Sequence, residues 1–167
     1  KLKIIGGNKL SGSISCSGAK NAALPMLAAT ILSDKAITFK NLPYLQDITT
    51  MFEILGSMGA DISLNENMDF TISTSNLHDF EARYELVKTM RASILVLGSL
   101  VARHGFARIA LPGGCAIGTR PVDFHLDALQ KLGAKIELKN GYIEASSKKL
   151  RGCEITFPGV SVTGTEN

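Results

Sequence analysis

The sequence predicts an α/β fold of the α+β kind, arranged inside out, with helices in the core and sheets facing outward. Three observations support this prediction. A unit of helix, strand, helix and hairpin occurs twice along the chain. Two stretches of helical length, 22–32 and 92–102, are apolar on every side, as helices buried on all sides are. The strand-like stretches alternate apolar and polar residues, as half-exposed sheets do.

The repeat is visible in two pairs of similar stretches. Residues 22–43 match residues 91–112 at an offset of 69, and residues 55–64 match residues 129–138 at an offset of 74. The second unit therefore holds five additional residues, 74 against 69, just after its Leu-Pro. The sequence there is GGCAIGTR, and insertions on a repeated scaffold tend to lie on its binding face.

Each unit is expected to hold the same elements in the same order. The first should contain a buried helix, a strand, an amphipathic helix and two further strands, at 22–32, 36–40, 47–58, 61–65 and 70–74. The second repeats this order with a helix, a strand that ends in Leu-Pro, a helix and two strands, the helices at 92–102 and 122–132 and the last two strands at 135–139 and 142–146. Asn140-Gly141 between these strands signals a type I′ hairpin. Pro25 is expected near the first turn of its helix, where a missing N–H costs least.

Composition limits the classes of partner. The 167 residues are 45% apolar and 20% charged, which is typical of a folded globular chain. The net charge is +3 without a run of Lys or Arg, so we expect no nucleic-acid partner. No stretch reaches the roughly 18 apolar residues of a membrane span, so we expect no membrane partner either. The cysteines show no metal-ligand spacing, which indicates a cytoplasmic protein with free thiols and no metal or other cofactor.

The three cysteines differ in their surroundings. Cys16 and Cys153 lie in strand-like stretches and are expected to be structural, as small apolar side chains. Cys115 lies between Gly114 and Arg120, where glycine amides and a guanidinium lower the pKa of a thiol. A thiol tuned in this way can donate and accept protons near neutral pH. The sequence therefore favours a chemical role for Cys115 alone.

Two helix starts carry a cation. Lys20 and Asn21 open the helix that contains Pro25, and the repeat offset places Arg91 at the equivalent position of the second unit. Helix N-termini favour anions and disfavour cations, so an anionic ligand would explain both cations. The alternative is that Asn21 is an ordinary N-cap and that Lys20 and Arg91 are solvated. Together with the cysteine loop, these residues indicate a repeat protein that acts on a phosphorylated small molecule.

The stretches SGAKNAALP, LVKTMRASILVLGSLVAR, LPGGCAIGTRPVDFHLDALQKLGA and VSVTGTEN closely resemble the UDP-N-acetylglucosamine 1-carboxyvinyltransferase family, whose members open bacterial peptidoglycan synthesis. The resemblance covers the whole chain. It implies two domains, each an inside-out barrel of three βαβαββ units. Residues 1–19 would form a strand region of the other domain, and residues 20–167 two units and the start of a third, so the barrel is incomplete in this chain.

The resemblance also implies the site. It assigns phosphoenolpyruvate binding to Lys20, Asn21, Arg91 and Arg120. It makes Cys115 the general acid and the residue that the antibiotic fosfomycin alkylates. It assigns UDP-N-acetylglucosamine binding to Asn21, Arg91, Arg120, Pro121, Val122, Asp123, Phe124, Val160, Ser161 and Val162. The chain departs from the family at Gly159, where some members have lysine, and at Thr163-Gly164.

The implied reaction transfers the enolpyruvyl group of phosphoenolpyruvate to the sugar 3′-hydroxyl by addition and elimination, without a metal or other cofactor. One alternative is that this chain is an inactive fragment or a UDP-sugar-binding module that lacks the second half of the active site. The other is the sister phosphoshikimate enolpyruvyl transferase, which lacks the Cys115 loop.

Overall fold

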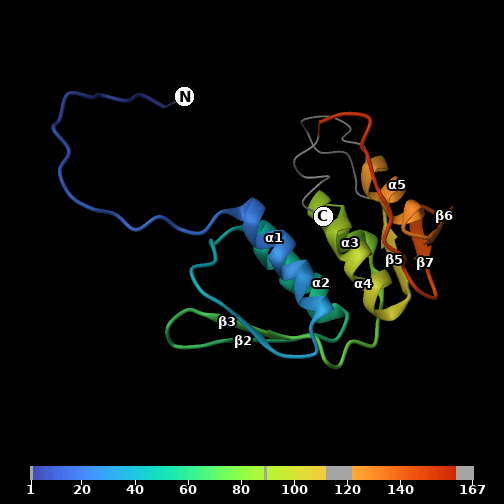
Figure 1. The fold of residues 1–167 in the computed structure, drawn as a ribbon. Coiled ribbons are helices and arrows are strands. Elements are labelled where there is room, and N and C mark those ends of the chain that lie inside the picture. The colour runs from blue at the N-terminus through green and yellow to red at the C-terminus, as the bar shows by residue number, and fades with distance from the viewer. Residues whose placement is uncertain (1, 89, 112–121, 161–167) are drawn as a thin grey trace.

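Two copies of one unit lie side by side in the structure, a computed structural model that describes residues 2–88, 90–111 and 122–160 (Figure 1). The first unit comprises α1 (Lys20–Ala29), η1 (Thr30–Leu32), β1 (Ile37–Phe39), α2 (Gln46–Ser57), β2 (Asp61–Leu64) and β3 (Phe70–Ser73). The second comprises β4 (Glu81–Ala82), α3 (Tyr84–Val87), η2 (Arg91–Ile94), α4 (Leu95–His104), β5 (Phe106–Ala110), α5 (Asp123–Lys131), β6 (Lys135–Lys139) and β7 (Tyr142–Ser146).

The two sheets confirm the repeat. The first sheet has the order β1-β3-β2, and the second has the corresponding order β5-β7-β6, all with antiparallel neighbours. Among the described residues, only the second sheet has a further strand, because β4 pairs in parallel with β5. In both units an isoleucine of the central strand is buried at the middle of the sheet, Ile72 in β3 and Ile143 in β7. The alternation predicted for the strands thus turns one face of each sheet to the core.

Helices α1, α2 and α4 each contribute buried apolar side chains to the core, as the sequence predicts for the stretches 22–32 and 92–102. Helices α1 and α2 pack together, and α4 contacts α1, η1, β5 and β7. In Figure 1, α4 lies between α1 and the second sheet. Its buried side chains are Val96, Leu97, Leu100 and Val101. One helix of the second unit therefore joins the cores of both units.

Helix α1 departs from two predictions. It is buried on one side only, through Ala23, Leu24, Leu27 and Ala28, whereas Met26 on the other side is 50% exposed. Apolar residues on a helix side indicate that this side can be buried. They do not indicate whether another helix or strand of this chain packs against it. Helix α1 also begins at Lys20, so Pro25 lies inside the helix rather than in its first turn.

The structure confirms the predicted hairpin turn and contradicts the predicted surroundings of Cys16 and Cys153. Asn140 and Gly141 have φ angles of 51° and 80°, so both adopt the left-handed conformation that a type I′ hairpin requires. The stretches around Cys16 and Cys153 are not strands, and both thiols are exposed. The prediction that they are structural side chains of strands is therefore wrong, since no sheet neighbour covers them in the described residues.

Arg103, near the end of α4, ties the two units together. Its Nη1 donates hydrogen bonds to the carbonyl oxygens of Ile31 and Ser33, at 2.7 and 2.5 Å, and to Thr74 Oγ1 at 3.2 Å. Ile31 belongs to η1, at the end of the first unit's helix, where the last carbonyls have no N–H partner from a further helical turn. The guanidinium thus satisfies acceptors of one unit from a helix of the other.

In the described part of the chain, no helix combines the length and the apolar character needed to cross a membrane.

Replacing Arg103 by methionine should lower the free energy of unfolding by about 2–3 kcal/mol, because the carbonyls of Ile31 and Ser33 lose a charged donor. Urea denaturation measures this change. The control is Arg83→Met, since Arg83 is 67% exposed and makes one ion pair at 3.3 Å, so its loss should cost less than about 1 kcal/mol. Equal effects of the two substitutions would contradict the role of Arg103.

Candidate functional site

The parallel strands β4 and β5 end side by side at one edge of the second sheet, and each is followed along the sequence by a predicted site segment. After β4 the chain runs through α3 to Arg91, and after β5 it enters residues 112–121. The carboxyl ends of parallel strands are where α/β proteins commonly bind ligands. The hairpin turn of β6 and β7 lies at the same edge, because Leu111 N–H donates to the carbonyl of Gly141 at 2.9 Å.

Several predicted site residues fall outside the described ranges. Cys115, Arg120 and Pro121 lie in 112–121, and Ser161 and Val162 lie in 161–167. Of the predicted residues that are described, Lys20, Asn21, Arg91, Val122, Asp123 and Phe124 all lie at or next to the start of a helix. Val160 is described and fully exposed.

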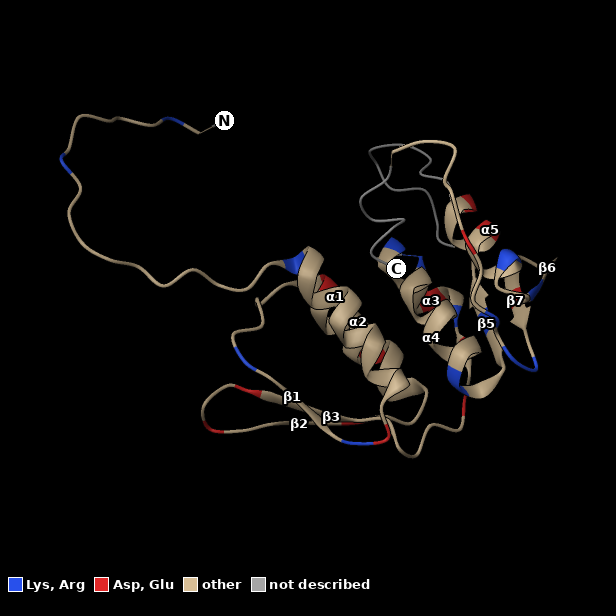
Figure 2. Ribbon diagram, viewed as in Figure 1, with Lys and Arg blue, Asp and Glu red and all other residues tan. Residues whose placement is uncertain are grey.

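The first helix start holds an ion pair. Lys20 Nζ lies 2.7 Å from Asp47 Oδ2, and the two side chains are 44% and 32% exposed. Lys20 is the first residue of α1, and Asp47 lies in the first turn of α2. Figure 2 shows the blue start of α1 beside the red first turn of α2. Asn21 follows Lys20 and is exposed.

A close backbone contact sets the start of α1 against the loop that precedes α2. Gly18 N–H donates to the carbonyl of Asn41 at 3.1 Å, and Asn41 Nδ2 donates to the carbonyl of Cys16 at 3.2 Å. A Cβ at Gly18 would lie 2.3 Å from the Asn41 carbonyl oxygen, so only glycine permits this approach. Asn41 itself has a φ of 57°, which asparagine tolerates better than most residues.

The second helix start brings Arg91 and α5 together. His125 of α5 has a pKa below its ordinary value, first because it is partly buried and second because the Arg91 guanidinium is near. The imidazole is therefore neutral at pH 7 and adds no positive charge beside Arg91. Val122, just before α5, is buried. The structure thus places Arg91 close to the helix that the family resemblance assigns to the sugar nucleotide.

A groove runs along α5. Its volume is about 490 Å³, and its lining residues are Asp123, Phe124, Asp127, Lys131, Thr156, Phe157 and Pro158. Phe124 stacks on Phe157 with ring centroids 5.2 Å apart, which holds the segment before Val160 against α5. Aromatic side chains beside charged groups suit a ligand with an apolar ring and polar substituents.

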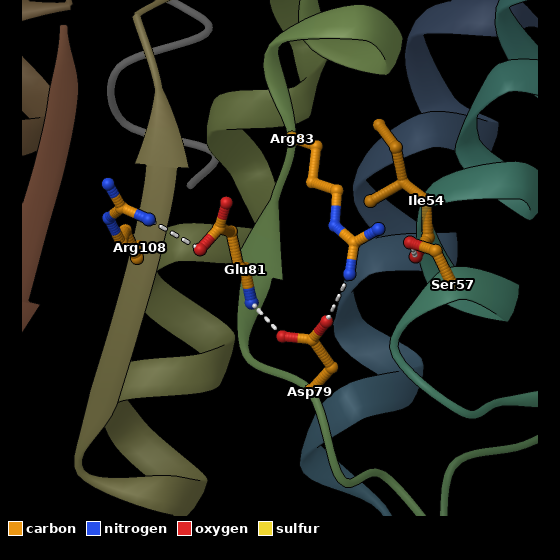
Figure 3. A network of polar contacts seen from close by, with 6 residues as sticks. All are labelled: Ile54, Ser57, Asp79, Glu81, Arg83 and Arg108. Carbon is orange, nitrogen blue, oxygen red and sulfur yellow. Dashed lines mark hydrogen bonds and ion pairs between the residues drawn. The ribbon is translucent and has the colours of Figure 1, made fainter.

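A polar network fixes the strand that leads to Arg91 (Figure 3). Arg108 of β5 donates to Glu81 of β4 at 2.6 Å, and its Nε lies 3.3 Å from Glu144 of β7. Its guanidinium also lies over the Tyr142 ring, 3.9 Å from the centroid. Asp79 accepts the backbone N–H of Glu81 at 3.0 Å. The short strand β4 is therefore held by side chains as well as by its ladder.

Lys88, between α3 and η2, is engaged locally. It pairs with Glu85, and this hydrogen bond raises the pKa of the ammonium. Its ammonium also lies 5.9 Å from the centre of the Tyr84 ring. Among the described residues, no group of three or more His, Cys, Asp or Glu side chains gathers as a metal site would require.

Sequence reasoning missed three members of this region: Asp47, His125 as a neighbour of Arg91, and Phe157. A sequence signal for Asp47 exists. The second long helix of each unit carries an acidic residue in its first turn, Asp47 in α2 and Asp123 in α5. The other two depend on how α5 packs, and the sequence holds no local signal for that packing.

The comparisons with known proteins agree with this arrangement. The family model described as EPSP synthase (3-phosphoshikimate 1-carboxyvinyltransferase) matches residues 4–167. A protein of Halorhodospira halophila named UDP-N-acetylglucosamine 1-carboxyvinyltransferase is 54% identical over all 167 residues. A protein of the same name from Coxiella burnetii is 54% identical over 168 residues. The chain spans 40% and 39% of the lengths of these two relatives.

Solved structures show the same fold. The enolpyruvyl transferase NikO from Streptomyces tendae superposes with a TM-score of 0.74 and 26% identity, over 90% of this chain and 33% of its own. EPSP synthase from Acinetobacter baumannii superposes with a TM-score of 0.69 and 16% identity, over 93% of this chain and 36% of its own. The inside-out arrangement predicted from the repeat is thus the fold of enolpyruvyl transferases.

Replacing Gly18 by alanine should lower the free energy of unfolding by about 1–3 kcal/mol, because the new Cβ collides with the Asn41 carbonyl. Gly6→Ala is the matched control, since nothing lies within 4 Å of a Cβ at Gly6. Thermal and urea denaturation of both variants check the prediction. If alanine were tolerated equally at the two positions, the start of α1 would not be held by this contact.

Proposed function

This chain belongs to the EPSP synthase family, and from that membership we propose that it is the N-terminal portion of an enzyme that acts on UDP-N-acetylglucosamine. The proposed reaction transfers the enolpyruvyl group of phosphoenolpyruvate to the 3′-hydroxyl of the sugar and releases phosphate. The observation that carries this proposal is the 54% identity, over the whole chain, to proteins named for that reaction. The motif around Cys115 supports it, because the sister enzyme lacks that loop.

Electrostatics support binding of phosphoenolpyruvate at the two helix starts. Its phosphate and carboxylate need cations and N–H donors, and Lys20 with the start of α1 supplies both. Arg91 supplies a planar fork of donors, which matches either group. Because burial and Arg91 keep His125 uncharged near pH 7, the positive charge beside α5 remains on the guanidinium. Arg120 is proposed to complete this set from the loop.

The chemical step follows from the roles that the resemblance gives. The sugar hydroxyl oxygen attacks C2 of phosphoenolpyruvate while Cys115 donates its proton to C3, which yields a tetrahedral adduct. The Cys115 thiolate then takes a proton back from C3, which expels phosphate from C2 and restores the double bond. Arg91 and Arg120 stabilise the charge on the phosphate and carboxylate throughout. The base that takes the proton of the sugar hydroxyl is proposed to lie in the remainder of the enzyme.

The groove along α5 supports binding of the sugar nucleotide. Phe124 and Phe157 offer aromatic surface, and Asp123 at the start of the helix offers a hydrogen-bond acceptor. Val122, Asp123 and Phe124 would hold the uridine and sugar, with Val160, Ser161 and Val162 near the diphosphate. The exposed thiols of Cys16 and Cys153 fit the cytoplasm as the place of action.

One observation favours a second candidate function. The matching family model carries the description of the sister enzyme, 3-phosphoshikimate 1-carboxyvinyltransferase. That enzyme transfers the same group from phosphoenolpyruvate to another phosphorylated acceptor. The two functions share the site for phosphoenolpyruvate and differ in the acceptor.

To test this proposal, the full-length gene product is incubated with phosphoenolpyruvate and either UDP-N-acetylglucosamine or shikimate 3-phosphate. Phosphate release and the mass of the product are measured. We expect turnover only with the UDP-sugar. Cys115→Ser should lower kcat by about 100-fold or more, because a general acid is lost. Cys153→Ser, at an exposed thiol outside the site, should leave kcat unchanged. Turnover with shikimate 3-phosphate alone would assign the sister function, and turnover with neither acceptor would contradict both.

A further inference from the structure

We propose that Asp47 is a positioning residue, which holds the Lys20 ammonium at the start of α1 so that an anionic ligand meets it there. The observation is the ion pair of Lys20 Nζ with Asp47 Oδ2 at 2.7 Å. This inference rests on the proposed function, because it takes phosphoenolpyruvate as the ligand of Lys20. It adds a residue that the sequence did not single out.

The surroundings of α1 show why its lysine needs a partner. A cation at a helix N-terminus is repelled by the helix dipole. Helix α1 has no acidic residue in its first turn and no side-chain cap, so it offers Lys20 no local anion. Lysine also has a flexible four-carbon stem, which without a partner samples many positions. Without a partner from another helix, the Lys20 ammonium would therefore turn away from the start of α1.

Helix α2 supplies the missing anion. Asp47 lies in the first turn of α2, where the dipole of that helix favours a carboxylate. The contact of Gly18 with Asn41 brings the start of α1 to the loop that leads into α2. The carboxylate is thus fixed by one helix and faces the first residue of the other.

The pair leaves Lys20 able to bind a ligand. An ammonium has three N–H donors, and the bond to Asp47 uses one of them. The Lys20 side chain is 44% exposed, so the remaining donors can reach a phosphate or carboxylate at the start of α1. Asp47 therefore orients the cation without blocking it.

The main test is Asp47→Asn in the full-length enzyme, which keeps the shape of the side chain and removes its charge. We expect the KM for phosphoenolpyruvate to rise about tenfold, equivalent to ~1.4 kcal/mol of binding, while the KM for UDP-N-acetylglucosamine stays within about twofold. The matched control is Glu137→Gln. Glu137 pairs with Lys135 and Lys139 on β6 of the second sheet and, like Asp47, has a side chain that is 32% exposed. Its loss should leave both KM values unchanged.

A double-mutant cycle separates positioning from folding. In a Lys20→Met background, Asp47→Asn should have no further effect on the binding of phosphoenolpyruvate measured by calorimetry, because Asp47 acts through Lys20. An equal loss in both backgrounds would overturn the proposal, since Asp47 would then act without Lys20. An unchanged KM for phosphoenolpyruvate in Asp47→Asn, with the wild type active, would also overturn it.

A third measurement does not require turnover. The rate at which an acylating reagent modifies Lys20, read by peptide mass spectrometry without any ligand, should rise in Asp47→Asn, because the ammonium is released from its ion pair. The rate at Lys20 should not change in Glu137→Gln. If the wild type turned over neither acceptor, the proposed function would be wrong. The acylation rate at Lys20 would even then show whether Asp47 holds the Lys20 ammonium. An unchanged rate would refute that contact.

Discussion

The burial of α4 is the constraint on which the rest of the structure depends. Its apolar sides contact α1 and η1 of the first unit and β5 and β7 of the second, so neither unit completes its core alone. Arg103 then closes the junction by donating to the carbonyls at the end of η1. Because a buried helix admits few orientations, η2, which leads into α4, and α1 keep a fixed relation, and the first residue of each is a cation.

That relation sets the positions of the two cations of the candidate site. Each unit presents a helix start with a cation, which the helix dipole disfavours. Asp47 offsets the charge of Lys20 from a neighbouring helix, and His125 stays neutral beside Arg91. The network around Arg108 holds β4, which leads the chain toward Arg91. These contacts surround the two cations at which we propose that phosphoenolpyruvate binds.

The sequence predicted the elements better than it predicted their surroundings. The repeat, the alternating strands and Asn140-Gly141 yielded the order of helices and strands and the hairpin, because each depends on local pattern. The open side of α1 and the exposure of Cys16 and Cys153 were mispredicted, because burial depends on neighbours far along the chain. For the candidate site, the repeat predicts Lys20 and Arg91 at equivalent helix starts, and their role in binding stays a prediction. The pairing of Lys20 with Asp47 and the approach of His125 to Arg91 depend on how four helices pack. No local signal in the sequence encodes that packing.

We propose that these residues form part of an enolpyruvyl transfer site in which Cys115 is the tuned thiol. The most direct measurement is peptide mapping by mass spectrometry after treatment of the full-length protein with fosfomycin, with and without UDP-N-acetylglucosamine. We expect a single adduct on Cys115, formed faster with the nucleotide sugar, and none on the exposed thiols of Cys16 and Cys153. Equal labelling of all three thiols, or no adduct on Cys115, would contradict it.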